Sequence, residues 1–596
     1  MNFWPFQHSL KNQPKPSHGK SAFVQQILLV CHREDKYGSA LIENFCAVLE
    51  FAKVRYMILD LGVQSTWPDL SYFSSILICT ERIESLSRAV VASIREHLGC
   101  GRGLFIGMRG WNDQLSKTFG FAGKKPSMHN GSGLNIHHDI IPGASNLSIT
   151  GSQLRRVHSS FDISKEDLAP ECIILASDED KTPLAWYKNA GDANIVYWNT
   201  VLLARREMRG FFLQTLLLTM NTPVVAVENF AVFQIDDFPP SLSDTPPPQI
   251  DREFANVSWN EFIFDIWYDD MMSLKDMYAL KYTWYAVMNY HDADVNQLEQ
   301  RTPNEREFDK RILNARLERT KPIKGDDEIA LHGYNHVPLI EESWPNIQTL
   351  KMKLLYAREL WEENFPEYMP RSWVPANNQY HSEHVSMVKT VFPEIDVVCS
   401  NYSAGSFADG MFRDFGLEPW DTSLYCLPRE TYGYVMKPEL KLMMLSQIGS
   451  LGLWTHFIHP DDIFDIPSDT TRESYNRNID RLYWRRENDK GAPGMFTQLE
   501  QWIGFVRKTF PWIKFVTTSE AHKQLIRHYK KNIKIELSRS NISIDCDEDS
   551  GYFIRTQKNQ TIHAHKNCSI LGQANLFKGR LYFIKCGKGP STVKII

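Results

Sequence analysis

The sequence of 596 residues lacks a long apolar run, a closely spaced cysteine pair and an excess of charge of either sign. No stretch approaches the roughly 20 apolar residues that a bilayer-spanning helix needs, so we expect no membrane span. The opening residues MNFWPFQHSLKNQPKPSHGKS contain neither the apolar core nor the small-residue cleavage site of a secretory signal. These absences predict a cytoplasmic protein.

The ten cysteines are scattered between Cys31 and Cys586 without any C-x-x-C pair. This spacing argues against a zinc ribbon and against a dense disulfide framework. The 66 Lys+Arg and 71 Asp+Glu give a net charge of −5, which offers no reason to expect a nucleic-acid partner. Aromatic residues make up 12% of the chain, which suits the stacking of sugar rings, although a large aromatic core gives the same count.

The chain is too long for one hydrophobic core, which predicts several domains. A proline-rich stretch follows a carboxylate pair, and no internal repeat is present. Alternating strands and helices fill most of the chain, and the last residues alternate apolar with polar side chains. We predict four segments: disordered residues 1–22, an α/β unit at 23–225, a second α/β unit at 226–528 and a small all-β appendage at 529–596.

The first α/β unit begins with the apolar run Gln26–Cys31, a buried strand, followed by an amphipathic helix at Ala40–Ala52. Strands that alternate with helices predict a parallel sheet, so we expect a flavodoxin-like or amidotransferase-like fold. Its glycine-rich segment GCGRG does not match a dinucleotide-binding loop. We therefore expect this unit to be non-catalytic, and the rest of the chain to work without it.

The second α/β unit places polar residues directly after apolar runs. Asp236 and Asp237 end the run AVFQIDD, and because adjacent carboxylates repel, such a pair needs a cation or a raised pKa. Taken alone, most such pairs are explained by a solvated turn. His332 follows Ile329–Leu331, and His336 comes four residues later. If a helix begins here, both imidazoles share a face and can reach one ion.

Two further groups supply a cation and a proton donor. Arg371, in PRSWVP, would keep a nearby catalytic aspartate ionised, although a surface arginine gives the same pattern. The apolar run LGLWTHFIHP contains His456 and His459. A histidine at the end of a strand is suited to act as a general acid. Strand side chains alternate, so only one of the two can face the site. Pro460 pins the backbone after His459 and favours that residue, although the two roles could be exchanged.

In this order, the groups resemble the motifs of the NodB-homology polysaccharide deacetylases, carbohydrate esterase family 4. The family's T-F-D-D is matched by Gln234–Asp237. Its H-[ST]-x-x-H is matched by His332–His336, with Gly333 in place of the serine or threonine. Its strand-end Leu-His resembles Ile458–Pro460.

Other parts of the motif set match less closely. Arg371 with Pro375 is a looser form of the family's Arg-x-Pro segment, and Trp420 with Asp421 is a weak candidate for the fourth motif. The insert between the first two motifs is long. The resemblance covers about half the chain and implies a distorted (β/α)7 barrel for residues 226–528.

The resemblance also implies a division of roles. Asp237, His332 and His336 would bind a divalent metal, with Zn²⁺ the best match to this donor set and Co²⁺ or Ni²⁺ as alternatives. Asp236 would be the base and His459 the general acid. The remaining expectations are Arg371 as a catalytic cation, and Trp373, His456 and Asp461 as substrate contacts.

The function implied is metal-dependent hydrolysis that removes acetyl groups from the N-acetylhexosamines of a polysaccharide or oligosaccharide. The whole architecture resembles a bacterial group associated with exopolysaccharide genes, which implies the synthesis machinery as a further partner. A carbohydrate-binding or assembly component with little or no catalysis is the alternative from another class. Deacetylation of a small sugar is also left open, since the residues do not discriminate polymer from monomer.

Overall fold

A computed structural model gives the fold for most of the chain, and the segment 1–22, expected to be disordered, lies outside the described residues. Within the described part, no helix is both long and apolar enough to cross a membrane. All ten cysteines are described, and they form no disulfide. The described residues are 25–63, 66–155, 157–240, 248–292, 295, 301–319, 326–401, 414–467 and 477–596.

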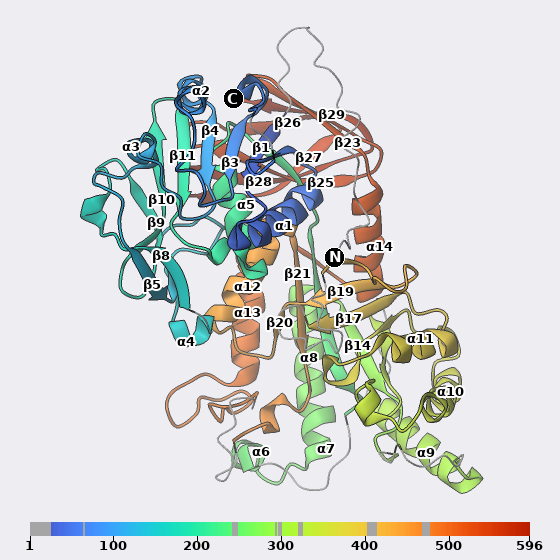
Figure 1. Ribbon diagram of the computed structural model, residues 1–596. Helices are drawn as coiled ribbons and strands as arrows, with labels where there is room; N and C mark the ends of the chain where they lie inside the picture. The colour runs from blue at the N-terminus through green and yellow to red at the C-terminus, as the bar shows by residue number, and fades with distance from the viewer. Residues whose placement is uncertain are drawn as a thin grey trace.

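The N-terminal unit is built on a nine-stranded sheet, coloured blue to cyan in Figure 1. The strands, in the order in which they pair, are β2 (Arg55–Asp60), β1 (Gln26–Cys31), β3 (Ser75–Ile78), β4 (Gly103–Ile106), β11 (Ala193–Trp198), β10 (Pro183–Ala190), β9 (Ile173–Ser177), β6 (Leu134–Ile136) and β7 (Leu147–Ile149). The first five are parallel, as expected, but the last four pair antiparallel.

Helices cover both faces of this sheet because its strands are apolar on both faces. Ile27 and Leu29 pack in the core with α1 (Lys36–Phe51), whereas Leu28 and Val30 pack with α2 (Arg88–Gly99) on the other face. A separate two-stranded ribbon lies beside the sheet. The remaining elements of this unit are β5 (Met128–Ser132), β8 (Val157–Phe161), α3 (Ser116–Phe119), α4 (Gly151–Leu154) and α5 (Arg209–Leu217).

The second unit is built on a ten-stranded sheet that curls into a half-barrel. In pairing order its strands are β18 (Gly416–Leu417), β19 (Tyr425–Arg429), β17 (Val397–Asn401), β16 (Ser372–Trp373), β15 (Glu328–Gly333), β14 (Tyr282–Val287), β13 (Phe230–Phe238), β21 (Leu453–Ile458) and β20 (Thr431–Tyr432), with β22 (Lys514–Val516) also on β13. All pairs are parallel except β18 with β19. The distorted (β/α)7 barrel implied by the resemblance is not confirmed.

Helices of this second unit follow its strands, as a parallel sheet requires, and most of them lie in the lower half of Figure 1, whereas α14 lies higher, toward the C-terminal sheets. They are α6 (Pro248–Glu253), α7 (Trp259–Glu261), α8 (Tyr268–Tyr278), α9 (Pro303–Arg319), α10 (Ile347–Asn364), α11 (Ser382–Val391), α12 (Pro438–Leu451), α13 (Met495–Thr509) and α14 (Thr518–Lys530).

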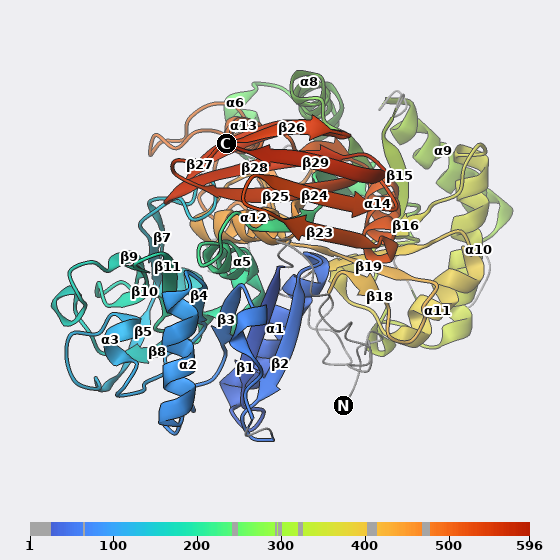
Figure 2. The same cartoon turned by 90° about the horizontal axis from the view of Figure 1, so that it is seen from above.

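The C-terminal strands form two four-stranded antiparallel sheets, seen from above in Figure 2. One is β12 (Val224–Val227), β25 (Ser550–Gln557), β28 (Gly579–Cys586) and β27 (Cys568–Leu576). The other is β23 (Ile533–Leu537), β24 (Asn541–Cys546), β29 (Gly589–Ile595) and β26 (Ile562–Lys566). Both contribute to one apolar cluster, so they pack face to face. β12, at the predicted boundary between the α/β units, pairs with β25 and so belongs to this third unit.

The first and second units share a core through α5 and α12. All nine residues of α5 are buried, and the Gly210 N–H donates to the Ser446 hydroxyl at 2.8 Å. A Cβ at Gly449 would lie 3.5 Å from the Gly210 Cα, so the two helices approach closely through glycine. The Gln214 amide donates to the Gly449 carbonyl at 2.8 Å. This shared core argues against the expectation that the second unit works without the first.

We expect Gly210→Ala to destabilise the whole protein, because a Cβ there would lie 2.3 Å from the Ser446 carbonyl oxygen. Forcing a methyl group into such a contact costs about 1–3 kcal/mol. Chemical denaturation of the full chain measures this change in the free energy of unfolding. Gly99→Ala is the matched helical control, since a Cβ there meets nothing within 4 Å. Equal stability of the two variants would contradict the shared core.

Candidate metal centre and active site

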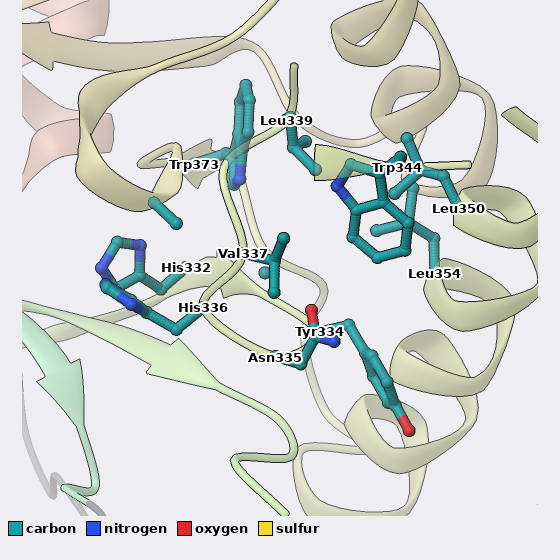
Figure 3. Close-up of a pocket in the computed structure, with 12 residues that line it drawn as sticks. His332, Tyr334, Asn335, His336, Val337, Leu339, Trp344, Leu350, Leu354 and Trp373 are labelled. Carbon is teal, nitrogen blue, oxygen red and sulfur yellow. The ribbon is translucent and has the colours of Figure 1, made fainter. Parts of the chain in front are cut away.

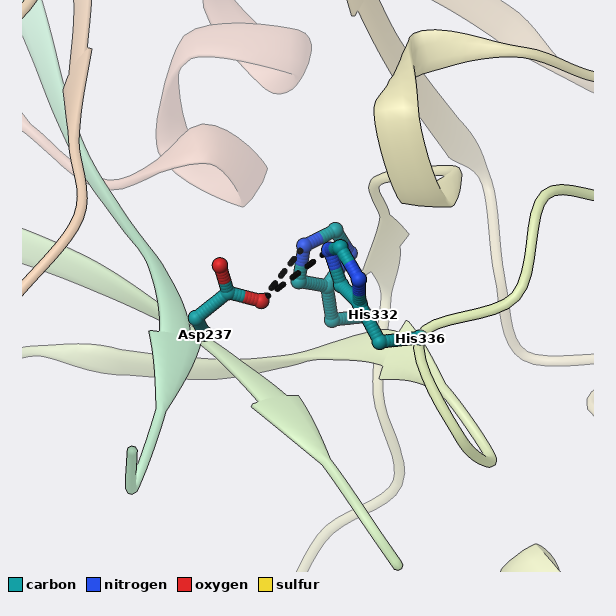
Figure 4. A group of neighbouring side chains, drawn as sticks. All are labelled: Asp237, His332 and His336. Atoms are coloured by element: carbon teal, nitrogen blue, oxygen red, sulfur yellow. Dashed lines mark ion pairs between the residues drawn. The ribbon is translucent and has the colours of Figure 1, made fainter. Parts of the chain in front are cut away.

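Three polar side chains gather where β13 and β15 end, because the carboxyl ends of parallel strands meet at one edge of a sheet. Asp237 Oδ1 lies 3.4 Å from His332 Nε2 and 3.2 Å from His336 Nε2, as Figure 4 shows. One ligand atom from each of these three residues lies within 4.8 Å of the others. The structure thus brings together the three predicted ligands, while their metal remains a prediction.

The adjacent carboxylates reach the same edge because β13 is irregular at its end. Neighbouring strand residues normally point to opposite faces. The pairing of β13 with β14 shifts register between Ile235 and Phe238, and Asp237 has φ 55°. This break in the pleat turns the Asp237 side chain toward the histidines while Asp236 stays buried beside it.

A turn, not a helix, brings His336 next to His332. β15 ends at Gly333, which has φ 123°, and His336 itself has φ 48°. L-residues with a side chain rarely adopt a φ near 123°, which accounts for glycine where the resembling family carries serine or threonine. No helix begins at His332, so the shared helix face that the four-residue spacing allowed is not what brings the two rings together. The two imidazole rings nevertheless lie 4.9 Å apart between centroids.

A backbone carbonyl determines which ring nitrogen of His332 carries a proton. Its Nδ1 lies 2.8 Å from the Val374 carbonyl oxygen, which can only accept, so Nδ1 carries a proton and Nε2 faces Asp237. Burial alone would lower the pKa of His332, but its hydrogen bond to Asp237 and the Asp237 charge raise it above its usual value. Tyr290 also donates to Asp237 Oδ1 at 3.2 Å. The space around Asp237 Oδ1 therefore favours positive charge.

Asp236 is held by an arginine that sequence reasoning missed. Its Oδ2 accepts from Arg429 Nη1 at 2.5 Å, and both side chains are almost fully buried. The Arg429 guanidinium also stacks 3.8 Å from the Phe457 ring centroid. Arg429 is the last residue of β19, so it could have been found as another charged residue that ends an apolar run.

Arg371, predicted to fill this role, lies elsewhere. It precedes β16, which places it at the amino end of a parallel strand, away from the edge where Asp236 lies. Its Nη2 pairs instead with Asp396 at 3.0 Å, and just over half of its side chain is exposed. The structure therefore corrects the assignment of Arg371 as the catalytic cation.

His459 and His456 face opposite ways, as the odd spacing along β21 requires. His459 Nε2 lies 3.7 Å from Asp236 Oδ2, and its Nδ1 lies 3.1 Å from Asp462 Oδ1. Burial would lower the pKa of His459, but the Asp462 charge raises it above its usual value. Arg477 in turn pairs with Asp462 at 2.8 Å. The structure therefore brings His459 to the aspartate pair.

His456, expected at the substrate, is instead fully buried behind the sheet. Its ring lies 4.7 Å from that of Trp502 on α13, and its Nδ1 lies 2.9 Å from the Thr431 hydroxyl. Burial lowers the pKa of His456 to about 3, so this histidine is neutral at ordinary pH. No substrate can reach it, which corrects that assignment.

Trp373 and Asp461 are the other two predicted substrate contacts. Trp373 is buried and lines a small cavity beside the two histidines, with Val337, Leu339 and Trp344 further in, as Figure 3 shows. A ring enclosed in this way offers no open face for stacking on a sugar. Asp461 pairs with Arg477 at 3.3 Å and is partly exposed, so its expected contact with substrate stays a prediction.

A family described as "Uncharacterised protein conserved in bacteria (DUF2194)" matches residues 118–582, and the chain belongs to that family. No curated protein matches the sequence. A Mycobacterium smegmatis protein described as a "putative polysaccharide deacetylase" is similar at 14% identity over 51% of this chain and 95% of that one, with a TM-score of 0.29. An exo-β-1,4-mannosidase from Opitutaceae bacterium strain TAV5 is similar at 12% identity over 30% and 32%, with a TM-score of 0.22.

We expect Arg429→Gln to cost far more stability than Arg371→Gln. Removing Arg429 leaves Asp236 buried without its ion-pair partner, which costs about 3–5 kcal/mol. Removing Arg371 breaks an exposed pair worth about 0–1 kcal/mol. The free energies of unfolding of the two full-length variants, measured by denaturant titration, give the comparison. Similar losses in both would show that Arg429 is not the cation on which Asp236 depends.

Proposed function

We propose that this member of an uncharacterised bacterial family is a metal-dependent carbohydrate N-deacetylase, which hydrolyses the acetamides of N-acetylhexosamines in a polysaccharide or oligosaccharide. The observation that carries the proposal is the convergence of Asp237, His332 and His336 on one point at a sheet edge. Beside them stand an aspartate with a fixed arginine and a histidine with a fixed aspartate, the groups that an amide hydrolysis needs.

The donor set fits a divalent metal. One carboxylate and two imidazoles are the ligand types of catalytic Zn²⁺ sites, and Co²⁺ or Ni²⁺ would also suit them. The hydrogen bond from His332 Nδ1 to a backbone carbonyl is the outer contact that commonly orients a metal-binding histidine. When bound, such an ion would polarise the acetamide carbonyl and lower the pKa of a water.

Asp236 is suited to take the proton of the attacking water. Its Oδ1 has no hydrogen-bond partner among the described residues, so a lone pair is available there. Its Oδ2 is fixed by Arg429, whose permanently charged guanidinium pairs with the carboxylate and sets its orientation. Asp236 can therefore accept a proton at Oδ1 without first breaking a hydrogen bond.

His459 is suited to protonate the leaving amine. The Asp462 carboxylate receives the Nδ1–H, so the proton at Nε2 is the one available for transfer, on the side that faces Asp236. Asp462 also stabilises the imidazolium form, which is the form that a general acid needs. The choice of an acetylated sugar, and of exopolysaccharide synthesis machinery as a partner, rests on the motif resemblance.

We expect Asp236→Asn to abolish acetate release while metal content is retained, and His336→Ala to lose both. Removal of a general base costs roughly 10²–10⁴-fold in rate. The measurement combines elemental metal analysis with acetate release from N-acetylglucosamine oligomers, using the full chain. Asp396→Asn is the control, since Asp396 pairs with the distant Arg371. Loss of metal in Asp236→Asn but not in Asp237→Asn would reverse the two roles. A metal-loaded protein without acetate release would favour a binding component.

We expect Asp462→Asn to shift the alkaline limb of kcat/KM to lower pH. A general acid works while protonated, so the rate is kept below the pKa of His459 and falls as pH rises through it. Because the Asp462 charge raises that pKa, its removal should move the limb to lower pH. Asp465→Asn is the matched control, since Asp465 also pairs with Arg477. If the alkaline limb of kcat/KM lies at the same pH in Asp462→Asn and in the unmodified chain, His459 is not the general acid.

A further inference from the structure

A second group of metal-type ligands lies in the N-terminal unit. His129 comes from β5, in the ribbon that stands beside the main sheet, whereas Asp178 and Asp180 follow β9 in the turn to β10. One ligand atom from each of the three lies within 4.8 Å of the others. His129 Nε2 is 3.3 Å from Asp178 Oδ2.

The Asp178 carboxylate is fully buried, and only one of its two oxygens accepts a hydrogen bond among the described residues. Its Oδ1 accepts the Thr182 N–H at 2.8 Å, but its Oδ2 has no hydrogen-bond partner among the described residues. His129 Nε2, which faces that oxygen, also lacks a hydrogen-bond partner there. Burying an unpaired charged oxygen is costly unless a cation or a donor compensates it. The two atoms face each other at 3.3 Å, and neither has a hydrogen-bond partner among the described residues.

A glycine lets the Asp178 carboxylate and the His129 ring approach the β5 backbone closely. A Cβ at Gly131 would lie 2.4 Å from Asp178 Oδ2 and 3.3 Å from His129 Nε2. The φ of Gly131 does not lie in the left-handed region, so its backbone conformation does not require glycine. His129 and Gly131 are two residues apart on one strand and share a face. Ser160, paired across from His129, adds a buried hydroxyl with no partner among the described residues.

We propose that His129, Asp178 and Asp180 form a second site, for a divalent transition-metal ion with a structural role. One imidazole and two carboxylates are ligands that suit Zn²⁺ or Mn²⁺, and such an ion would compensate the buried charge of Asp178. The ion would add a further link between the β5–β8 ribbon and the β9–β10 turn, which are already joined by the Glu179 N–H bond to the Ser132 carbonyl at 3.0 Å and by the Ser132 hydroxyl on Glu179. This site does not depend on the proposed deacetylase activity.

The test is a count of tight Zn²⁺ sites in the full-length protein after chelator stripping, by competition with a chromogenic chelator. His336→Ala removes the first candidate site, so a single tight site should remain in that variant. Adding Asp180→Asn or His129→Gln should weaken the remaining site by about tenfold or more. Glu179→Gln is the matched control, because it removes the neighbouring exposed acid without touching a ligand atom.

Thermal unfolding supplies a second readout. Zn²⁺ should raise the Tm of His336→Ala and of its Glu179→Gln double variant, but not of the Asp180→Asn double variant, since a ligand that binds only the folded state stabilises it. Asp180 is exposed, so its substitution leaves the fold intact where Asp178→Asn would leave a defect in the core. If His336→Ala binds no tight Zn²⁺, or if the Asp180 and Glu179 variants bind it equally, the cluster is a simple histidine–aspartate ion pair.

Discussion

The candidate active site depends on the burial of two adjacent carboxylates at the end of β13. Asp236 is about 1% exposed, and the charge on each aspartate must be offset locally because water cannot do so. Arg429 offsets the first, and the two histidines with Tyr290 surround the second. The other groups described near the centre, including the pair of His459 with Asp462, lie around these two carboxylates.

The curl of the parallel sheet provides these partners. Side chains that end β13, β15, β19 and β21 meet at one edge because parallel strands present the same end to the same side. Asp236 and Arg429 are 193 positions apart in the chain, yet they form a direct ion pair. Curvature of the sheet brings the strands that carry them within reach, and no local spacing in the sequence encodes that distance.

The units around the candidate site are not independent attachments. α5 from the first unit is buried against α12 of the second, and β12 between them completes a sheet of the C-terminal sandwich. One continuous apolar cluster therefore extends from α1 to α13. Stability of the catalytic edge is tied to this shared core, which is why the units are best treated as one folded body.

The sequence by itself determined which residues end apolar strands, and for Asp236, Asp237, His332, His336 and His459 this was enough to predict that they gather. Strand periodicity also separated His459 from His456, because an odd spacing places the two on opposite faces. Tertiary structure alone decided that Arg429, and not Arg371, holds Asp236: both are arginines beside strands, but one ends its strand and the other precedes it. It also decided that a turn through Gly333 replaces a helix, since a four-residue spacing is compatible with either, and only the backbone path of the folded chain selects one.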